Sequence, residues 1–310
     1  MYFLGVDGGQ SSTTAVIGDE RGRVLGRGEA GPCNHVESET GREKLVAAVS
    51  ESIAAAARAA GLQPPEEYDA ACFGMSGGAA DKRELIASIV KANRLEVTHD
   101  AHIALLGATA GEPGIIVIAG TGSIAYGRNR EGRTARAGGW GHIFGDEGGG
   151  FDIVRQALRA ALRQEEGWGP ATSLGRRLME AAGAATVNDV LHLLYTRDFP
   201  RDRVAGWAPL VDAAAAEGDA VARSLLQQAA QQLATLAGSV RSQLFAPGDP
   251  VYVAAIGGVF QSQTLAEWVR ILVELEPGAT VGPPRHDPAT GALLGAWLSA
   301  GVAVTLREAR

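Results

Sequence analysis

The sequence contains very little cysteine and no long apolar run, and each absence narrows the class of protein. Cys33 and Cys72 are the only two cysteines, and their spacing matches no metal or redox motif, so we expect two reduced, structural thiols. No apolar run approaches the roughly 20 residues of a membrane helix. The first residues show no basic flank or cleavage site of a signal peptide. We therefore expect a cytoplasmic protein with no membrane partner.

A cluster of basic residues is also missing. The formal net charge is −7 over 310 residues, and no Lys/Arg cluster interrupts it, which argues against a nucleic acid partner. The composition, 46% hydrophobic and 20% charged, is typical of a globular protein. A chain of this length can bury a large core and is expected to form two domains.

Two glycine loops are the most informative feature that is present. They lie within residues 2–17 and 115–126, and in each an apolar strand runs into glycines and hydroxyl residues. β-Branched or aromatic residues and then a polar turn follow, which is typical of a β-hairpin. A glycine-rich tip exposes backbone amides that, with neighbouring hydroxyls, can bind phosphate oxygens. The candidate phosphate-binding residues are Gly8, Gly9, Ser11, Ser12, Thr121 and Gly122.

Other phosphate-binding motifs fit these loops less well. A Walker loop requires Gly-Lys-Ser/Thr, and no lysine follows either glycine cluster. Residues 120–125 fit the loose dinucleotide pattern G-x-G-x-x-A, but the chain turns at 129–132 instead of continuing as an amphipathic helix. Ordinary glycine turns remain an alternative, which the pairing of the two loops makes less attractive.

The hairpin pattern occurs twice and predicts two similar α/β halves. The cluster Gly-Glu-Pro-Gly at 111–114 is the best domain boundary. We expect one domain over 1–112 plus about 291–310, and a second over 113–290 that carries a helical insertion. Helices are expected at 43–60, 81–91, 153–163, 174–182, 187–195, 220–244 and 265–273, with a last helix opening at about 290.

Two aspartates follow predicted strands and are candidates for chemistry. Asp7 ends the first strand, where its carboxylate would face phosphates across Mg²⁺, a metal that prefers oxygen ligands and keeps several waters. The alternative is an aspartate that caps its own turn. Asp100 follows a short strand and precedes a helix. It would accept the proton of a hydroxyl that attacks the terminal phosphate, or it would merely cap the helix.

The segment 138–150 combines many glycines with one tryptophan, one histidine and two carboxylates. This composition suits a loop that closes on a small ligand, with Trp140 against a sugar ring and Asp146 accepting hydrogen bonds from hydroxyls. The alternative is a glycine-rich surface loop with a buried tryptophan. His142 has no further histidine or cysteine nearby, so metal binding is discounted. Asn34 carries little independent weight, and Gly257-Gly258 either admits a flat base or simply ends a strand.

These motifs give the chain a resemblance to a known family. From Asp7-Gly8-Gly9 through 120–123 and 139–148 to 251–258, it resembles the N-acetylglucosamine kinase branch of the BadF/BadG/BcrA/BcrD ATPase family. The resemblance runs nearly end to end, and 139–148 is its most specific part. It implies two ribonuclease-H-like, actin-like ATPase domains around a central cleft, with ATP and Mg²⁺ as cofactors.

The resemblance also implies roles for individual residues. Asp100 would be the base, Ser11 and Thr121 would contact the phosphates of ATP, and the remaining assignments fall into two groups. The sugar would be contacted by Asn34, Asp100, Ser123, Gly139, Trp140, Gly141 and Asp146. The nucleotide would lie near Gly206, Gly257, Gly258 and Ser262.

Two departures from the family pattern bear on function. Family members often carry Gly-Thr where this chain has Gln10-Ser11; serine keeps the hydroxyl, and Gln10 is unexplained. Dehydratase activators of the same family hold an iron-sulfur cluster through cysteines. Neither Cys33 nor Cys72 lies in such a pattern, which counts against that role.

The resemblance therefore implies an enzyme that transfers the γ-phosphoryl group of MgATP to the 6-hydroxyl of N-acetylglucosamine or a related amino sugar. A glucosamine or N-acetylmuramic acid kinase would share every motif. A dehydratase-activating ATPase and a non-catalytic sugar sensor or actin-like assembly protein remain as alternatives. We expect a small amino sugar as ligand and a homodimer as the assembly.

Overall fold

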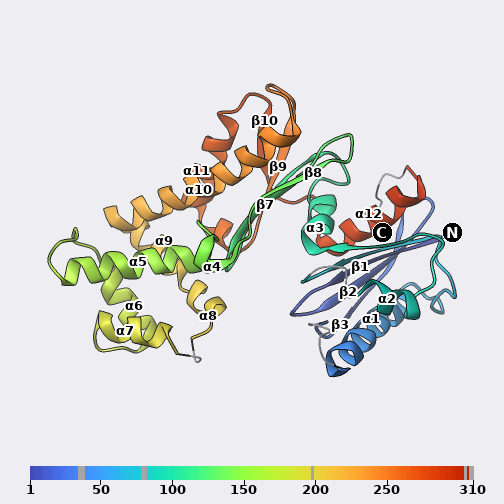
Figure 1. The fold of residues 1–310 in the computed structure, drawn as a ribbon, viewed down its shortest axis with the longest axis horizontal. Helices are drawn as coiled ribbons and strands as arrows, with labels where there is room; N and C mark the ends of the chain where they lie inside the picture. Colours follow the sequence, from blue (N-terminus) through green and yellow to red (C-terminus); the bar gives the residue numbers. More distant parts are fainter. Residues whose placement is uncertain (34–38, 78–81, 197–198, 304–305, 307–310) are drawn as a thin grey trace. The chain divides into compact units, whose positions relative to one another are not determined.

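Two compact units make up the chain. The computed structural model describes residues 1–33, 39–77, 82–196, 199–303 and 306. One unit comprises Met1–Glu112 with Pro284–Arg310, and the other comprises Pro113–Pro283. Each unit is built on a five-stranded sheet with helices packed on it (Figure 1). The expected α/β fold class is confirmed.

The sheet of the first unit mixes antiparallel and parallel pairs. Its strands are β1 (Tyr2–Gly8), β2 (Thr13–Asp19), β3 (Val24–Ala30), β4 (Ala70–Met75) and β5 (Leu95–His99), in the order β3-β2-β1-β4-β5. The pairs β1–β2 and β2–β3 are antiparallel, as in a hairpin meander. The pairs β1–β4 and β4–β5 are parallel, so β1, β4 and β5 all end at the same edge of the sheet. Asp7, Ser76 and Asp100 lie at or just beyond these strand ends.

Helices cover both faces of this sheet. They are α1 (Glu39–Ala59), α2 (Arg83–Ile89), α3 (Asp100–Ala108) and α12 (Pro288–Ala300). In Figure 1, α1 and α2 lie on one side of the sheet and α12 on the other. A hydrophobic core fills each side: Leu45, Val49 and Ile53 of α1 belong to one, and Leu293 and Trp297 of α12 to the other.

Small residues allow α12 to lie directly on its neighbours. A methyl group on Gly5 would fall 2.1 Å from the backbone nitrogen of Leu293, and one on Gly291 would fall 2.0 Å from the carbonyl oxygen of Ile103 in α3. Backbones approach this closely only where glycine leaves out the side chain. The small residues of the last helix therefore let it pack closely on β1 and α3.

The second unit repeats the same topology. Its strands are β6 (Gly114–Ala119), β7 (Ser123–Arg128), β8 (Thr134–Gly138), β9 (Val251–Ile256) and β10 (Ala279–Gly282), in the order β10-β9-β6-β7-β8. Again the first three strands pair antiparallel and the last two join in parallel. Read from β8 to β10, the order matches that of the first unit, which explains the twin hairpin patterns in the sequence.

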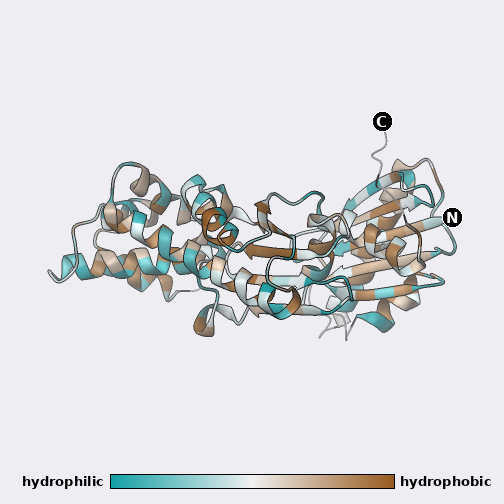
Figure 2. Cartoon of the chain, turned by 90° about the horizontal axis from the view of Figure 1, so that it is seen from above, coloured by the Kyte–Doolittle hydropathy of each residue, from teal (hydrophilic) through white to brown (hydrophobic). Residues whose placement is uncertain are grey.

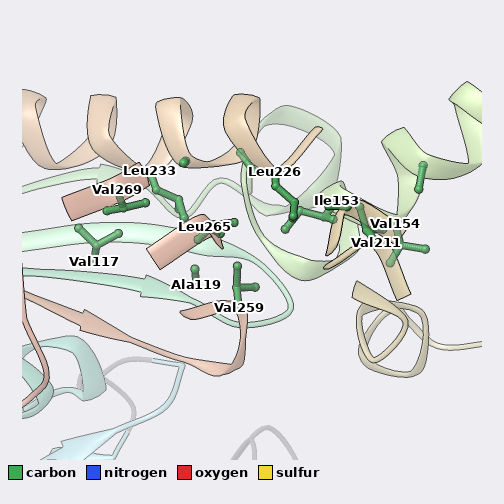
Figure 3. Packing of buried hydrophobic residues seen from close by; sticks show 14 of the residues in the cluster. Val117, Ala119, Ile153, Val154, Val211, Leu226, Leu233, Val259, Leu265 and Val269 are labelled. Atoms are coloured by element: carbon green, nitrogen blue, oxygen red, sulfur yellow. The ribbon is translucent and has the colours of Figure 1, made fainter. Parts of the chain in front are cut away.

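Helices of the second unit form one cover and one insertion. α10 (Ala220–Leu244) and α11 (Gln263–Glu274) pack on the sheet, where Leu233, Leu265 and Val269 meet Val117 (Figure 3). Between β8 and α10 lie α4 (Gly141–Phe144), α5 (Gly150–Glu165), α6 (Leu174–Ala182), α7 (Val187–Leu194), α8 (Arg201–Ala205) and α9 (Ala208–Ala216). In Figure 2 the strands are largely coloured apolar, whereas the helices are banded with polar residues.

Several expected helix bounds differ from those observed. α1 begins four residues before the expected position 43, and α2 is shorter than the expected 81–91. α5 begins at Gly150, inside the stretch that the sequence predicts to be a loop, and α4, α8 and α9 were not predicted. None of the helices in the described ranges is long and apolar enough to cross a membrane.

Candidate functional site

The first glycine tip joins β1 to β2 and is held by backbone hydrogen bonds. The amide of Gly9 donates to the carbonyl of Ser12 at 2.9 Å, and the amide of Cys33 donates to the carbonyl of Gly9 at 3.1 Å. A methyl group on Gly8 would fall 2.7 Å from the sulfur atoms of Cys33 and Met75, so only glycine fits there. Ser11 and Ser12 are exposed at the tip, as is Gln10, for which the structure shows no role. The hydroxyls are therefore available to a ligand.

Asp7 is the penultimate residue of β1, next to this tip. Among the described residues, its carboxylate accepts no hydrogen bond, so the turn-capping alternative has no support here. Burial, with smaller contributions from the nearby carboxylates of Asp100 and Asp287, raises the pKa of Asp7 to about 6, and Arg27 opposes this. A half-buried carboxylate without a partner suits a cation or its bound water. In the described ranges no group of three or more metal-ligating side chains exists, so the metal would also need oxygens from phosphates and water.

Asp100 opens α3 but does not cap it. His99 is the N-cap, and its Nδ1 accepts from the amide of His102 at 3.2 Å. The carboxylate of Asp100 accepts from its neighbour's amide, Ala101, at 2.8 Å and from the hydroxyl of Ser76 at 3.0 Å. Ser76 follows β4, so two adjacent strand ends fix the orientation of this carboxylate. Ser76 was not among the predicted site residues.

A third aspartate of this unit forms an ion pair with an arginine. Asp287 caps α12 by accepting from the amide and the hydroxyl of Thr290, and Arg27 of β3 donates to its Oδ2 at 2.8 Å. Burial works against ionisation, but the bonds from Arg27 and Thr290 hold the pKa of Asp287 below its usual range. Asp287 therefore contributes a structural negative charge near Asp7, with its own counter-ion.

The second glycine tip joins β6 to β7 and packs on the start of α5. The amides of Gly150 and Phe151 donate to the carbonyls of Gly120 and Thr121 at 2.7 and 3.1 Å. A methyl group on Gly149 would fall 2.7 Å from the carbonyl carbon of Gly122. The glycines of 148–150 were expected to give a small ligand access to the loop. In the structure Gly149 and Gly150 let the tip and α5 meet, and Gly148 lies against Leu233 of α10.

A cavity of about 490 Å³ adjoins this second tip, a volume suited to a small-molecule ligand. It brings together four of the residues predicted to lie near the nucleotide: Thr121, Gly206, Gly258 and Ser262. Gly257 does not line it; a methyl group there would fall 2.3 Å from the carbonyl oxygen of Ala119, so this glycine ends β9 against β6. Apolar side chains form much of the wall, among them Ile153, Leu226, Val259 and Leu265. Figure 3 labels these four residues within the hydrophobic core of the unit.

Two acidic residues that line this cavity were not predicted from the sequence. Asp202 belongs to α8 and Asp212 to α9, two helices that carry no recognisable motif. The hydroxyl of Ser262 donates to Asp212, and the same hydroxyl caps α11 by accepting from the amide of Leu265. A carboxylate at this position can accept hydrogen bonds from ligand hydroxyls.

The predicted sugar segment lies directly beside the second tip. A methyl group on Gly122 would fall 2.4 Å from Oδ2 of Asp146, so that carboxylate rests against the tip. Asp146 has a φ of 63°, rare for a residue other than glycine, and within the described ranges its carboxylate accepts no hydrogen bond. The hydroxyl of Ser123 donates to the carbonyl of Glu147 at 2.6 Å. Backbone strain of this kind recurs at ligand sites, because the surrounding structure must enforce it.

Trp140 and its flanking glycines form the other end of this segment. Gly139 and Gly141 have φ values of 72° and 78°, which glycine adopts without strain. Trp140 is 64% exposed, which excludes the buried-tryptophan alternative, and the guanidinium of Arg136 lies 4.5 Å from its ring centroid. One face of the indole is thus occupied by a cation. Asn34, also predicted to contact the sugar, lies outside the described residues.

Comparison with known proteins identifies the family. The model of the BadF/BadG/BcrA/BcrD ATPase family matches residues 4–296. The chain belongs to this family. Membership implies that it uses ATP, and the predicted resemblance is confirmed at this level.

Individual relatives of this ATPase match over nearly their whole length. The N-acetylmuramic acid/N-acetylglucosamine kinase of Clostridium acetobutylicum is 34% identical over 302 residues, covering 94% of this chain and 97% of the relative. The N-acetyl-D-glucosamine kinase of Dictyostelium discoideum is 29% identical over 309 residues, covering 94% and 96%. A solved structure, that of a candidate N-acetylglucosamine kinase from Chromobacterium violaceum, superposes with a TM-score of 0.71 at 31% identity, covering 94% of this chain and 98% of the other.

The cysteines of this family member lie in the core of the first unit. Cys33 is 1% exposed and Cys72 is fully buried, and both are free thiols. Burial raises the pKa of both thiols, which disfavours the thiolate that a metal cluster needs. The expectation of two reduced, structural thiols agrees with this environment.

Proposed function

We propose that this ATPase-family member transfers the γ-phosphoryl group of MgATP to the 6-hydroxyl of N-acetylglucosamine or a related amino sugar. One observation carries the proposal: the tip 120–123 borders both candidate ligand sites of its unit. Gly120 and Thr121 line the cavity, and Gly122 contacts the carboxylate of Asp146. The hydroxyl of Ser123 donates a hydrogen bond to the carbonyl of Glu147, the residue after Asp146. A nucleotide in the cavity would extend its phosphates along the same tip that positions a sugar-binding carboxylate.

The roles of the first unit follow from its chemistry. Asp100, oriented by Ser76, would accept the proton of the attacking hydroxyl. Asp7 would hold Mg²⁺ through water, and the ion when bound would neutralise charge on the phosphates. Ser11 and Thr121 would donate hydrogen bonds to phosphate oxygens. Positioning and charge neutralisation supply most of the catalysis in phosphoryl transfer, so we expect the exclusion of water to matter as much as the base.

The sugar would bind along 139–146 and at Ser123, with Asn34 as a further contact. The Clostridium relative is named for two sugars, and one of them, N-acetylmuramic acid, carries an ether-linked group that ends in a carboxylate. A third relative, from Vibrio cholerae, is named a glucosamine kinase. A kinase for N-acetylmuramic acid or for glucosamine is therefore the second candidate. These substrates differ at C2 and C3 and share the 6-hydroxyl, so the same phosphoryl transfer serves all three.

An ADP-release assay over a panel of amino sugars tests the proposal. We expect ATP-dependent turnover with N-acetylglucosamine or one of the two related sugars, and ³¹P–¹H NMR of the product should place the phosphate on O6. Turnover with none of the panel would reject the proposed activity. A brown, iron-loaded preparation would instead support a dehydratase activator. A homodimer and a cytoplasmic location belong to the same proposal, and light scattering of the purified protein tests the dimer.

A further inference from the structure

The loop that presents Asp146 has little packing of its own. α4 spans only Gly141–Phe144, and Ile143 and Phe144 are 71% and 82% exposed, so apolar burial does not anchor it. Asp146 nevertheless keeps a φ of 63°, which an unconstrained aspartate would leave. Polar contacts must therefore hold the loop in place, and the hydrogen bond from Ser123 to the carbonyl of Glu147 is one of them.

Two residues one turn apart on α5 bind both ends of this loop. Asp152, which is buried, accepts from the amide of Gly148 through Oδ2 at 3.1 Å. Its Oδ1 accepts from Nη2 of Arg155 at 2.7 Å. Arg155 then uses Nη1 to donate to the carbonyl of His142 at 3.0 Å. Arg155 thus holds the loop at His142 and Asp152 holds it at Gly148, and Asp146 lies between these two points in the sequence.

We propose that Asp152 and Arg155 are positioning residues for the sugar site: together they form a clasp that holds 142–148 so that the carboxylate of Asp146 stays against the second tip. The ion pair is half-shielded and hydrogen-bonded, which makes it stronger than an exposed pair. Gln156 adds a third donor to Asp152 at 3.2 Å, so the acceptor end is fixed as well. Arginine suits this task because its planar fork reaches two acceptors at once.

The sugar segment and the nucleotide cavity should respond differently to a change at Arg155, because the clasp holds only the sugar segment. The first turn of α5 supports the tip 120–122 through the backbone amides of Gly150 and Phe151, which do not involve the side chain of Arg155. Removing the guanidinium should release the loop but leave those amides in place. This inference rests on the proposed function, because it assigns the loop to sugar binding.

The test compares R155Q with R159Q. Glutamine keeps a polar stem but offers one amide nitrogen in place of the guanidinium fork. Arg159 lies one turn further along α5, is exposed, and makes no ion pair within the described ranges, so it controls for loss of an arginine from this helix. Hydrogen exchange of 141–149 is measured first, and then KM for the amino sugar and for ATP.

We expect faster hydrogen exchange across 141–149 in R155Q. Its kcat/KM for the sugar should fall on the order of 10- to 100-fold because KM for the sugar rises, and its KM for ATP should be unchanged. R159Q should behave like the unmodified protein in all three measurements. Unchanged exchange in R155Q would overturn the clasp, and faster exchange with an unchanged sugar KM would overturn its positioning role. A parallel loss of ATP affinity and thermal stability would mark Arg155 as merely structural.

A second variant covers the case in which R155Q does not fold. R155K retains the charge beside Asp152 but replaces two donor nitrogens by one, and we expect a smaller rise in sugar KM than in a folded R155Q, with exchange still faster than in the unmodified protein. R155K with normal exchange would overturn the proposal. If the unmodified protein phosphorylates no amino sugar, the proposed function fails, and the exchange comparison, which needs no turnover, still decides whether the clasp exists.

Discussion

The carboxylate of Asp146 rests against Cα of Gly122, where an added methyl group would fall 2.4 to 2.7 Å from its atoms. The end of a side chain can move aside more easily than backbone can, so G122A should fold while displacing Asp146. We expect KM for the amino sugar to rise on the order of 10-fold or more, because small misplacements of a binding group are costly. Steady-state kinetics with the sugar varied at saturating ATP measures this. A G122A enzyme with an unaltered sugar KM would show that Asp146 does not bind the sugar.

Gly238 offers a matched glycine-to-alanine substitution away from both sites. It lies exposed within α10, and apart from the helix's own backbone no atom of the described residues lies within 4 Å of the position where a methyl group would be added. Alanine favours the helix by up to about 1 kcal/mol over glycine. G238A should therefore raise the melting temperature and leave both KM values unchanged, as thermal denaturation and kinetics would show. A lower melting temperature would contradict the observed open space.

Asp100 should be indispensable for turnover and dispensable for nucleotide binding. Asparagine preserves the size of the side chain and its bond from Ser76 but cannot take up a proton. We expect D100N to lose about 10²- to 10⁴-fold in kcat, the range that a general base contributes, with ATP affinity retained. Single-turnover assays and a titration with a fluorescent ATP analogue measure the two quantities. Full activity in D100N would refute its role as the base.

Asp7 should link stability to pH in the ligand-free protein. Because its pKa is raised from 3.8 to about 6, the folded protein binds this proton more tightly than the unfolded chain does. Stability therefore falls as pH rises from about 4 to about 6, and ionised Asp7 costs up to about 3 kcal/mol above that window. D7N cannot ionise, so it should exceed the unmodified protein in free energy of unfolding at pH 8 but much less so at pH 4.

Urea unfolding of both proteins at the two pH values measures this difference. An equal difference at pH 4 and pH 8 would mean that Asp7 does not titrate in this window. D7N should at the same time lose Mg²⁺-dependent turnover, so a more stable yet inactive variant is the combined expectation. Normal turnover in D7N would instead remove Asp7 from the proposed metal site.

Asp212 should contribute to nucleotide affinity. It lines the cavity of the second unit and accepts a hydrogen bond from Ser262, which leaves further lone pairs for a ligand hydroxyl. A hydrogen bond to a charged group contributes about 1.5 to 3 kcal/mol, so D212N should weaken ADP binding about 10- to 100-fold. Isothermal titration with ADP tests this. The matched change D202N, at the other carboxylate of the cavity, shows whether the effect is specific to the partner of Ser262.

Residues close in the sequence to a glycine motif were the ones that sequence reasoning found. All of them lie within a few residues of glycines or strand ends, so the sequence alone is enough to recognise them: the two tips, Asp7, Asp100 and the stretch around Asp146. Asp202 and Asp212 lie on helices with no motif, and Ser76 became informative only when its hydroxyl was seen on Asp100. The use of the glycines at 148–150 was misjudged, because sequence alone cannot show that another backbone lies against them.

The sequence by itself determined the α/β class, the internal repeat and the places where backbone amides meet hydroxyls, because strand periodicity, glycine and turn chemistry act over short distances along the chain. Tertiary structure decided which distant residues meet. It formed the wall of the cavity from the second glycine tip and from α5, α8, α9, α10 and α11. It also set the contact between Gly122 and Asp146, and the hydrogen bonds by which Asp152 and Arg155 hold their loop. These contacts depend on how sheets and helices pack, which no local pattern encodes.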